Sequence, residues 1–192
     1  MTTSMAGIAC LRNGRSDIAH GVRKWLETVI DAQPDLQRGF YHAYRPGSGL
    51  VPGDGSVGYL VDATKPRQWY FQYGLSAAFL ADYSRVTGDT TAVDLARRYL
   101  HASRWCYEDV YRTPQSGKIG WGAAWTWTLT RDPADLALVN AVVDGLSALQ
   151  CGDGSWNAEG VYQASPEAAV ESRLDVTAEF VALLSQMEAA RV

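Results

Sequence analysis

Apolar residues recur at helical spacing in three amphipathic stretches of the chain. In residues 16–33 they fall at the i, i+3/i+4 and i+7 positions of one helix face, and residues 90–107 and 133–150 follow a similar pattern. In residues 90–107 charged side chains occupy the opposite face. We therefore expect three peripheral helices, each with one apolar side turned inward.

Each of these stretches is followed by a loop and then by a second kind of helix. Residues 67–88 are apolar on almost every side and contain small residues between Gly74 and Ala78, which let a neighbouring helix approach closely. Residues 119–132 again combine small and aromatic side chains, and residues 172–187 form the last such stretch. The chain thus predicts three rounds of peripheral helix, loop and buried helix.

The letters of two rounds match. Residues 74–79 read GLSAAF and residues 120–125 read GWGAAW, while Thr87-Gly-Asp is matched by Thr130-Arg-Asp. The corner tripeptides lie 43 residues apart, and a repeat of about this length, with the second helix about one turn shorter, is typical of arrays of helical pairs. The alternative is an ordinary helical bundle with coincidental alanines. We expect an N-terminal tail, residues 1–15, and one all-α domain of three helix pairs, residues 16–192.

Three segments carry a resemblance to a known fold. Residues 149–156 (LQCGDGSW) resemble the Q-x-x-D-G-x-W turn of terpenoid cyclases, residues 174–184 resemble the inner helix that follows it, and residues 85–89 (RVTGD) resemble the usual hairpin corner. The chain therefore resembles the α/α toroid superfamily, which includes these cyclases, prenyltransferase β-subunits and six-hairpin carbohydrate enzymes. The resemblance implies helical hairpin repeats that form half of an (α/α)6 barrel, because only three pairs are present.

The catalytic signatures of that superfamily do not carry over. No D-x-D-D motif occurs. Asp175 fits the first position of the prenyltransferase zinc site, but Thr177 stands where its cysteine would be and no histidine follows His101. We therefore expect neither a metal nor another cofactor.

Composition narrows the class of partner. The net charge is −4 without a long basic cluster, and no apolar run reaches the roughly 18 residues of a membrane span. We expect a cytoplasmic protein that binds neither nucleic acid nor membrane, with Cys10, Cys106 and Cys151 as free thiols. Half a ring would leave buried-type helices exposed, which predicts a homodimer or a heterodimer with a related half-barrel subunit.

The three loops that lead into buried helices, residues 34–69, 106–121 and 151–175, should meet at one mouth of the barrel. Candidate acid–base residues there are His42, Glu108 and Glu159, since imidazole and carboxylate groups exchange protons near neutral pH. The candidate substrate-binding residues are Tyr41, Asp62, Trp69, Tyr73, Arg112, Trp121, Trp125, Arg173 and Asp175.

Structural roles compete with these assignments. His42 is alternatively a surface histidine, Glu108 part of a solvated corner and Asp175 a helix cap, while the aromatic residues are alternatively core. Trp121 and Trp125 share a helix face that Trp127 cannot share. Arg112 with Lys118 would suit an anionic group.

The resemblance suggests a reaction class. Small half-toroid proteins that the chain resembles serve bacterial specialised metabolism, including paired subunits that form aziridine rings by expelling sulfate. We therefore expect a metal-independent enzyme subunit for ring closure, elimination or rearrangement of a small, anionic metabolite. His42 or a carboxylate would take the amine proton, and arginine or lysine would stabilise the departing anion. The alternatives are a carbohydrate-active enzyme and a non-catalytic subunit that completes another chain's barrel.

Overall fold

The structure is a computed structural model that describes the backbone of residues 2–157 and 166–191 and the side chains of residues 3–157 and 172–191. This part of the chain contains seven α-helices and only short strands, so the expectation of a mainly helical fold is confirmed. The helices are α1 (Thr2–Arg12), α2 (Ser16–Asp31), α3 (Phe71–Thr87), α4 (Thr91–Ser103), α5 (Gly117–Thr130), α6 (Pro133–Ala148) and α7 (Pro166–Arg191). None of the described helices is both long and apolar enough to cross a lipid bilayer.

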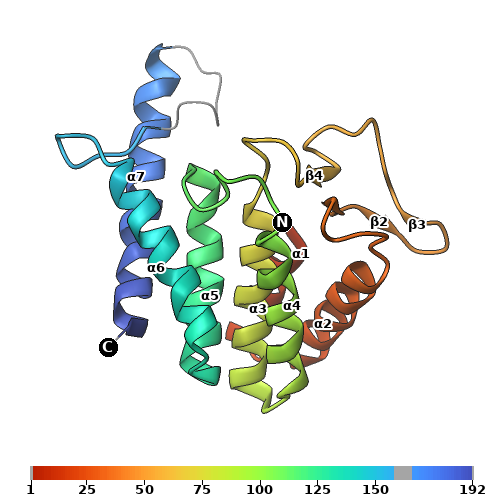
Figure 1. Cartoon of the computed structure of the whole chain (residues 1–192). Helices are drawn as coiled ribbons and strands as arrows, with labels where there is room; N and C mark the ends of the chain where they lie inside the picture. Colours follow the sequence, from red (N-terminus) through yellow and green to blue (C-terminus); the bar gives the residue numbers. More distant parts are fainter. Residues whose placement is uncertain (1, 158–165, 192) are drawn as a thin grey trace.

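The helices lie in two rows (Figure 1). Helices α1, α3, α5 and α7 pack one against the next and form a row that we call the inner row. Helices α2, α4 and α6, which we call the outer helices, cover one side of it. Helix α3 is buried from Phe71 to Ser84, whereas α4 buries one side only. The alternation of buried and amphipathic helices in the sequence is therefore the alternation of the two rows.

The N-terminal segment is not a tail. Residues 2–12 form α1, whose Ile8 and Leu11 are buried and whose Gly7 lies against the ring of Phe79 on α3. The hydroxyl oxygens of Ser4 and Ser76 are 3.4 Å apart. Residues 2–12 are therefore a helix packed on α2 and α3, and not a detached tail.

The two matched corner segments, residues 87–89 and 130–132, have the same backbone geometry. Gly88 has φ 77° and Arg131 has φ 54°, so both helices α3 and α5 end in a left-handed residue. The carboxylate of Asp89 then accepts the backbone N–H of Thr91 at 3.0 Å, and Asp132 accepts that of Ala134 at 2.8 Å. Each aspartate thus satisfies a free N–H at the start of the next helix.

The contact between α3 and α5 is made by backbone atoms. A Cβ atom on Gly74 would overlap the backbone of Lys118 and Ile119, and one on Gly122 would lie 2.6 Å from the carbonyl oxygen of Gly74. These two glycines let the helix axes approach more closely than side chains would allow. The start of α5 is therefore fixed beside the first turn of α3.

The long connection between α2 and α3 is not a plain loop. Strand β1 (Gly39–Tyr41) pairs antiparallel with β4 (Leu60–Asp62), and β2 (Tyr44–Arg45) pairs antiparallel with β3 (Gly49–Leu50). Phe40 and Val61 from the first of these sheets are buried in the core. The connection is thus anchored to the helices at its base.

Helix α7 starts earlier than the pattern predicted. It begins at Pro166, so Asp175 lies in its third turn and is not the helix cap that we considered. The preceding turn behaves as expected: Gly154 has φ 84° and the backbone N–H of Ser155 donates to Asp153 at 3.1 Å. Trp156 is buried, and its indole N–H donates to the carbonyl of Leu146 at 2.7 Å.

Candidate functional site

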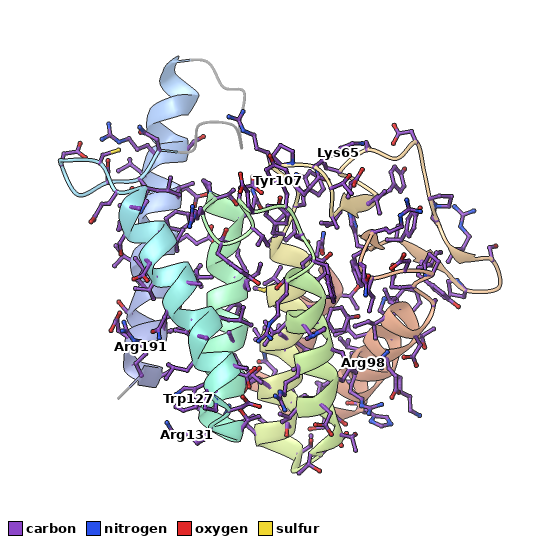
Figure 2. All side chains as sticks on the ribbon, viewed as in Figure 1. Lys65, Arg98, Tyr107, Trp127, Arg131 and Arg191 are labelled. Carbon is purple, nitrogen blue, oxygen red and sulfur yellow. The ribbon has the colours of Figure 1, made fainter. Side chains whose placement is uncertain are left out.

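The three long connections lie at the same end of the helices, which we call the mouth end and define by residues 32–70, 104–116 and 149–157 (Figure 1). Figure 2 shows Lys65 and Tyr107 at this end and Trp127 and Arg131 at the other. A direct contact joins two of the connections, because the backbone N–H of Arg67 donates to the Asp109 carboxylate at 2.8 Å.

His42 lies beside Trp69 at the mouth end, with ring centroids 6.3 Å apart. Its Nε2 is 3.1 Å from the carbonyl oxygen of Val57, and since that oxygen only accepts, Nε2 carries the proton. Burial lowers the pKa of His42, and the hydrogen bond to Val57 opposes this shift. His42 is therefore a neutral imidazole at pH 7, with Nδ1 free of a proton.

Two other residues of this region have structural partners. The backbone N–H and carbonyl of Tyr41 are both bonded, at 2.8 Å, by the side-chain amide of Gln33. The carboxylate of Asp62 accepts from the hydroxyl of Thr64 at 2.7 Å and pairs with Lys65 at 2.9 Å. These contacts, chiefly the one to Thr64, lower the pKa of Asp62. Asp62 thus stabilises the turn formed by residues 62–65.

Two hydrogen-bonded pairs, each with one buried tyrosine, lie under the mouth end, and the sequence predicted neither pairing. The Tyr70 hydroxyl donates to the Asp109 carboxylate at 2.5 Å, and the thiol of Cys106 donates to the Tyr73 hydroxyl at 3.6 Å. Both tyrosines are fully buried. Burial raises the pKa of each, and it raises the pKa of Cys106 to about 11. Tyr73 is therefore core, and Cys106 stays a protonated thiol.

The three acid–base candidates are not joined in the described part of the chain. Glu108 is exposed, and no hydrogen bond or ion pair links it to His42 or to another described residue. Glu159 lies outside the described residues. The neighbouring Asp109 is the carboxylate that bonds to the rest of the fold, through Arg67 and Tyr70. The sequence alone does not show which of the two carboxylates makes these contacts.

The two arginine candidates differ. Arg112 is exposed. Arg173 is held on the 153–155 turn, with its Nε 2.7 Å from the hydroxyl of Ser155 and its guanidinium 2.5 Å from the carboxylate of Asp153. Because Arg173 is already bonded to a carboxylate, Arg112 is the more available cation for an anion.

The tryptophans of α5 divide as their spacing predicts. The rings of Trp121 and Trp125 meet edge to face with centroids 5.1 Å apart, whereas the indole N–H of Trp127 donates to the carbonyl of Ala190 on α7 at 3.1 Å. Trp125 also borders a cavity of about 310 Å³ whose walls come from α3, α5 and α7 and from no outer helix. The Trp125 side chain therefore lies on the face of the inner row that is turned away from the outer helices, which we call the inner face.

Trp121 has an unusual environment on that face. Its side chain is only 8% exposed, and its indole N–H is buried without a hydrogen-bond partner among the described residues. A buried donor that lacks an acceptor costs about 1–3 kcal/mol. An acceptor brought by a bound molecule would remove that cost.

One turn before Trp121, Lys118 forms an ion pair with Glu179 of α7. Burial lowers the pKa of Lys118 to about 8, and the negative charge of Asp175 acts against that shift. Asp175 and Glu179 lie four residues apart on α7 and therefore share one face of that helix. The inner face thus carries one lysine, two carboxylates and the Trp121 N–H, and we call these four residues the inner-face cluster.

Part of this cluster could be predicted from the sequence. Trp121 and Asp175 are substrate-binding candidates of the sequence and Lys118 is a candidate cation, whereas Glu179 is not a candidate. Its spacing from Asp175 places the two carboxylates on one helix face but does not indicate the pairing with Lys118. Among the described residues no three histidine, cysteine, aspartate or glutamate side chains gather in a geometry that would hold a metal ion.

Comparison of the chain with models of known protein families, with curated proteins and with solved structures found no significant match.

Proposed function

We propose that this chain is one half of an α/α toroid and forms one wall of a metal-independent enzyme site for a small anionic metabolite, which a second polypeptide completes. The reaction proposed is intramolecular ring closure with loss of an anionic leaving group such as sulfate. The observation that carries this proposal is the inner-face cluster: a half-buried Lys118–Glu179 ion pair and, one helical turn after Lys118, the buried N–H of Trp121, which has no partner among the described residues.

The two-row arrangement supports the architectural part. In an α/α toroid the inner helices surround the substrate and the outer helices support them. Here the inner row carries Trp121 and Trp125 on the face that no outer helix covers. Aromatic walls of this kind bury the apolar part of a ligand and fold it into the conformation needed for attack.

The charges of the cluster suit the proposed chemistry. Glu179 would accept the proton of the attacking amine, and the amine nitrogen would form a bond to the carbon that bears the sulfate ester. The C–O bond to sulfate would break with its electron pair, so that sulfate leaves as an anion and no oxidant or reductant takes part. With a pKa of about 8, Lys118 is mostly protonated at pH 7 and would stabilise the departing anion, with the Trp121 N–H as a second donor.

The test uses 2-aminoethyl hydrogen sulfate, whose ring closure gives aziridine and sulfate. We expect the chain to accelerate sulfate release, measured by ion chromatography, and the variants Lys118→Met and Glu179→Gln to lose at least about tenfold of that rate. Lys24→Met is the matched control, because Lys24 is exposed on α2. The assay is run at about 100 µM chain, so that a second copy can complete the site. No acceleration at that concentration, or equal rates in all three variants, would contradict the ring-closure proposal and favour a non-catalytic subunit.

A further inference from the structure

Each outer helix begins after a corner in which one residue is left-handed. The left-handed residues are Gly14 with φ 71°, Gly88 with φ 77° and Arg131 with φ 54°. The residue that follows, which we call the corner residue, is Arg15 before α2, Asp89 before α4 and Asp132 before α6. The corner is thus a repeated feature, and its side chain changes from basic to acidic along the chain.

The acidic corners are held by an arginine on the preceding outer helix. Arg23 of α2 has its Nε 3.5 Å from the Asp89 carboxylate and donates to the Thr91 hydroxyl at 2.9 Å. Arg97 of α4 forms an ion pair with Asp132 in the same way. Since each arginine stands eight residues after its own corner residue, the same contact joins α2 to α4 and α4 to α6. We call it the corner latch.

The latch has unused partners at both ends of the array. Eight residues after Asp132, the position of the arginine is taken by Asn140 on α6, whose side-chain oxygen is buried with no hydrogen-bond partner among the described residues. At the other end, Arg15 stands where the other corners have aspartate. The pattern is therefore reversed at the ends: an amide acceptor lies on α6, and a guanidinium donor lies at the corner of α2.

Arg15 is available for such a contact. It pairs with Asp17 at 2.8 Å, but their side chains are 58% and 66% exposed. An exposed pair of this kind contributes little to stability, so the guanidinium can turn to another acceptor at small cost. The Asn140 side-chain oxygen is available too. Asn140 is partly exposed, and because rotation of its amide group exchanges the positions of oxygen and nitrogen, the oxygen can turn to the surface.

The inner row has matching apolar ends. On α7, Leu174 and Val181 are spaced by two helical turns and are 68% and 53% exposed. On α1, Met5 is 46% exposed, and Ala9, one turn later, is exposed too. Inside the inner row, the corresponding side of each helix is covered by the next inner helix, as α5 covers α3.

We propose that the α6–α7 edge of one chain seats the α1–α2 edge of a second copy of the same chain. In this contact the guanidinium of Arg15 donates to the side-chain oxygen of Asn140, and Leu174 and Val181 pack on the face of α1 that carries Met5. Because the two edges differ, the contact continues the array, and two copies that make it twice close a ring. That this ring encloses a substrate rests on the proposed function.

The experiment is sedimentation velocity of the full chain at concentrations up to about 100 µM. We expect a dimer that Val181→Glu dissociates, because a carboxylate would be buried against α1. Asn140→Arg should raise the dissociation constant at least about tenfold by placing two guanidinium groups together. The double variant Arg15→Glu with Asn140→Arg recreates the internal latch and should restore association.

Val86→Glu is the matched control, since Val86 is 46% exposed at the end of α3, away from both edges. Circular dichroism checks that each variant keeps its helices. A monomeric wild-type chain at the highest concentration, or a dimer that Val181→Glu and Asn140→Arg leave intact, overturns the proposal. A dimer without cyclisation activity contradicts only the proposed reaction, whereas a monomer with activity contradicts the dimer and the need for a second polypeptide but not the reaction.

Discussion

The sharpest prediction concerns Gly74, where α3 meets α5 backbone to backbone. In Gly74→Ala the new Cβ atom would overlap the backbone of Lys118 and Ile119, so the two helices must move apart. Overpacking of a core by one carbon costs about 1–3 kcal/mol when side chains can adjust, and here the obstacle is main chain. The better helix propensity of alanine returns about 0.5–1 kcal/mol. We expect a net loss of at least about 2 kcal/mol.

Equilibrium urea unfolding, followed by circular dichroism, measures this loss. The control is Gly21→Ala on α2, because a Cβ atom there would meet nothing within 4 Å. That variant should gain up to about 1 kcal/mol from helix propensity alone. If Gly74→Ala were as stable as Gly21→Ala, the close contact between α3 and α5 would be wrong. Since Lys118 stands at that contact, Gly74→Ala should also reduce any activity of the inner-face cluster.

Three further predictions concern the mouth end. Tyr70→Phe should cost about 1.5–3 kcal/mol in urea unfolding, because Asp109 loses a buried hydroxyl donor, whereas Tyr107→Phe at an exposed ring should be neutral. Cys106, with a pKa of about 11, should resist iodoacetamide at pH 8 in the folded chain, as mass spectrometry would show; rapid labelling would contradict its burial. Because burial depresses the pKa of His42, the unfolded chain binds a proton at this imidazole at a higher pH than the folded chain does. The free energy of unfolding should therefore fall as the pH drops below about 6.5, and the His42→Gln variant should lack this part of the pH dependence.

Much of the helical arrangement could be predicted because it depends on local rules. The corner at Thr87-Gly-Asp needs a left-handed residue and a carboxylate that accepts a backbone N–H, and the glycine and the aspartate supply both. At Thr130-Arg-Asp only the aspartate is such a signal, and the left-handed Arg131 was found through the match with the first corner. The shared face of Trp121 and Trp125 follows from helix geometry in the same way.

The errors arose where tertiary contacts decide. Helix α1 is short and contains Ser4 and Gly7, which are poor helix formers, and it is stabilised by packing on Phe79. Its signal was the i, i+3 spacing of Ile8 and Leu11. That spacing was too brief to set α1 apart from a tail.

The candidate site was harder to predict than the fold. Neighbours in sequence such as Glu108 and Asp109 have the same chemistry, and only the hydrogen bond from Tyr70, far away in the chain, ties one of them to the fold. The pairing of Lys118 with Glu179 joins residues on different helices in the same manner. No local pattern encodes such a meeting.

The glycine contact of α3 with α5 has a consequence for motion. Main-chain atoms in direct contact have no rotamers to exchange, so these two helices should move as one rigid body. The contact of α5 with α7 is different, because Gly120 faces the flexible side chain of Met187. If the inner face must widen to admit a molecule, the displacement should occur between α5 and α7, which would carry Glu179 away from Lys118 and uncover the lysine at the moment of entry.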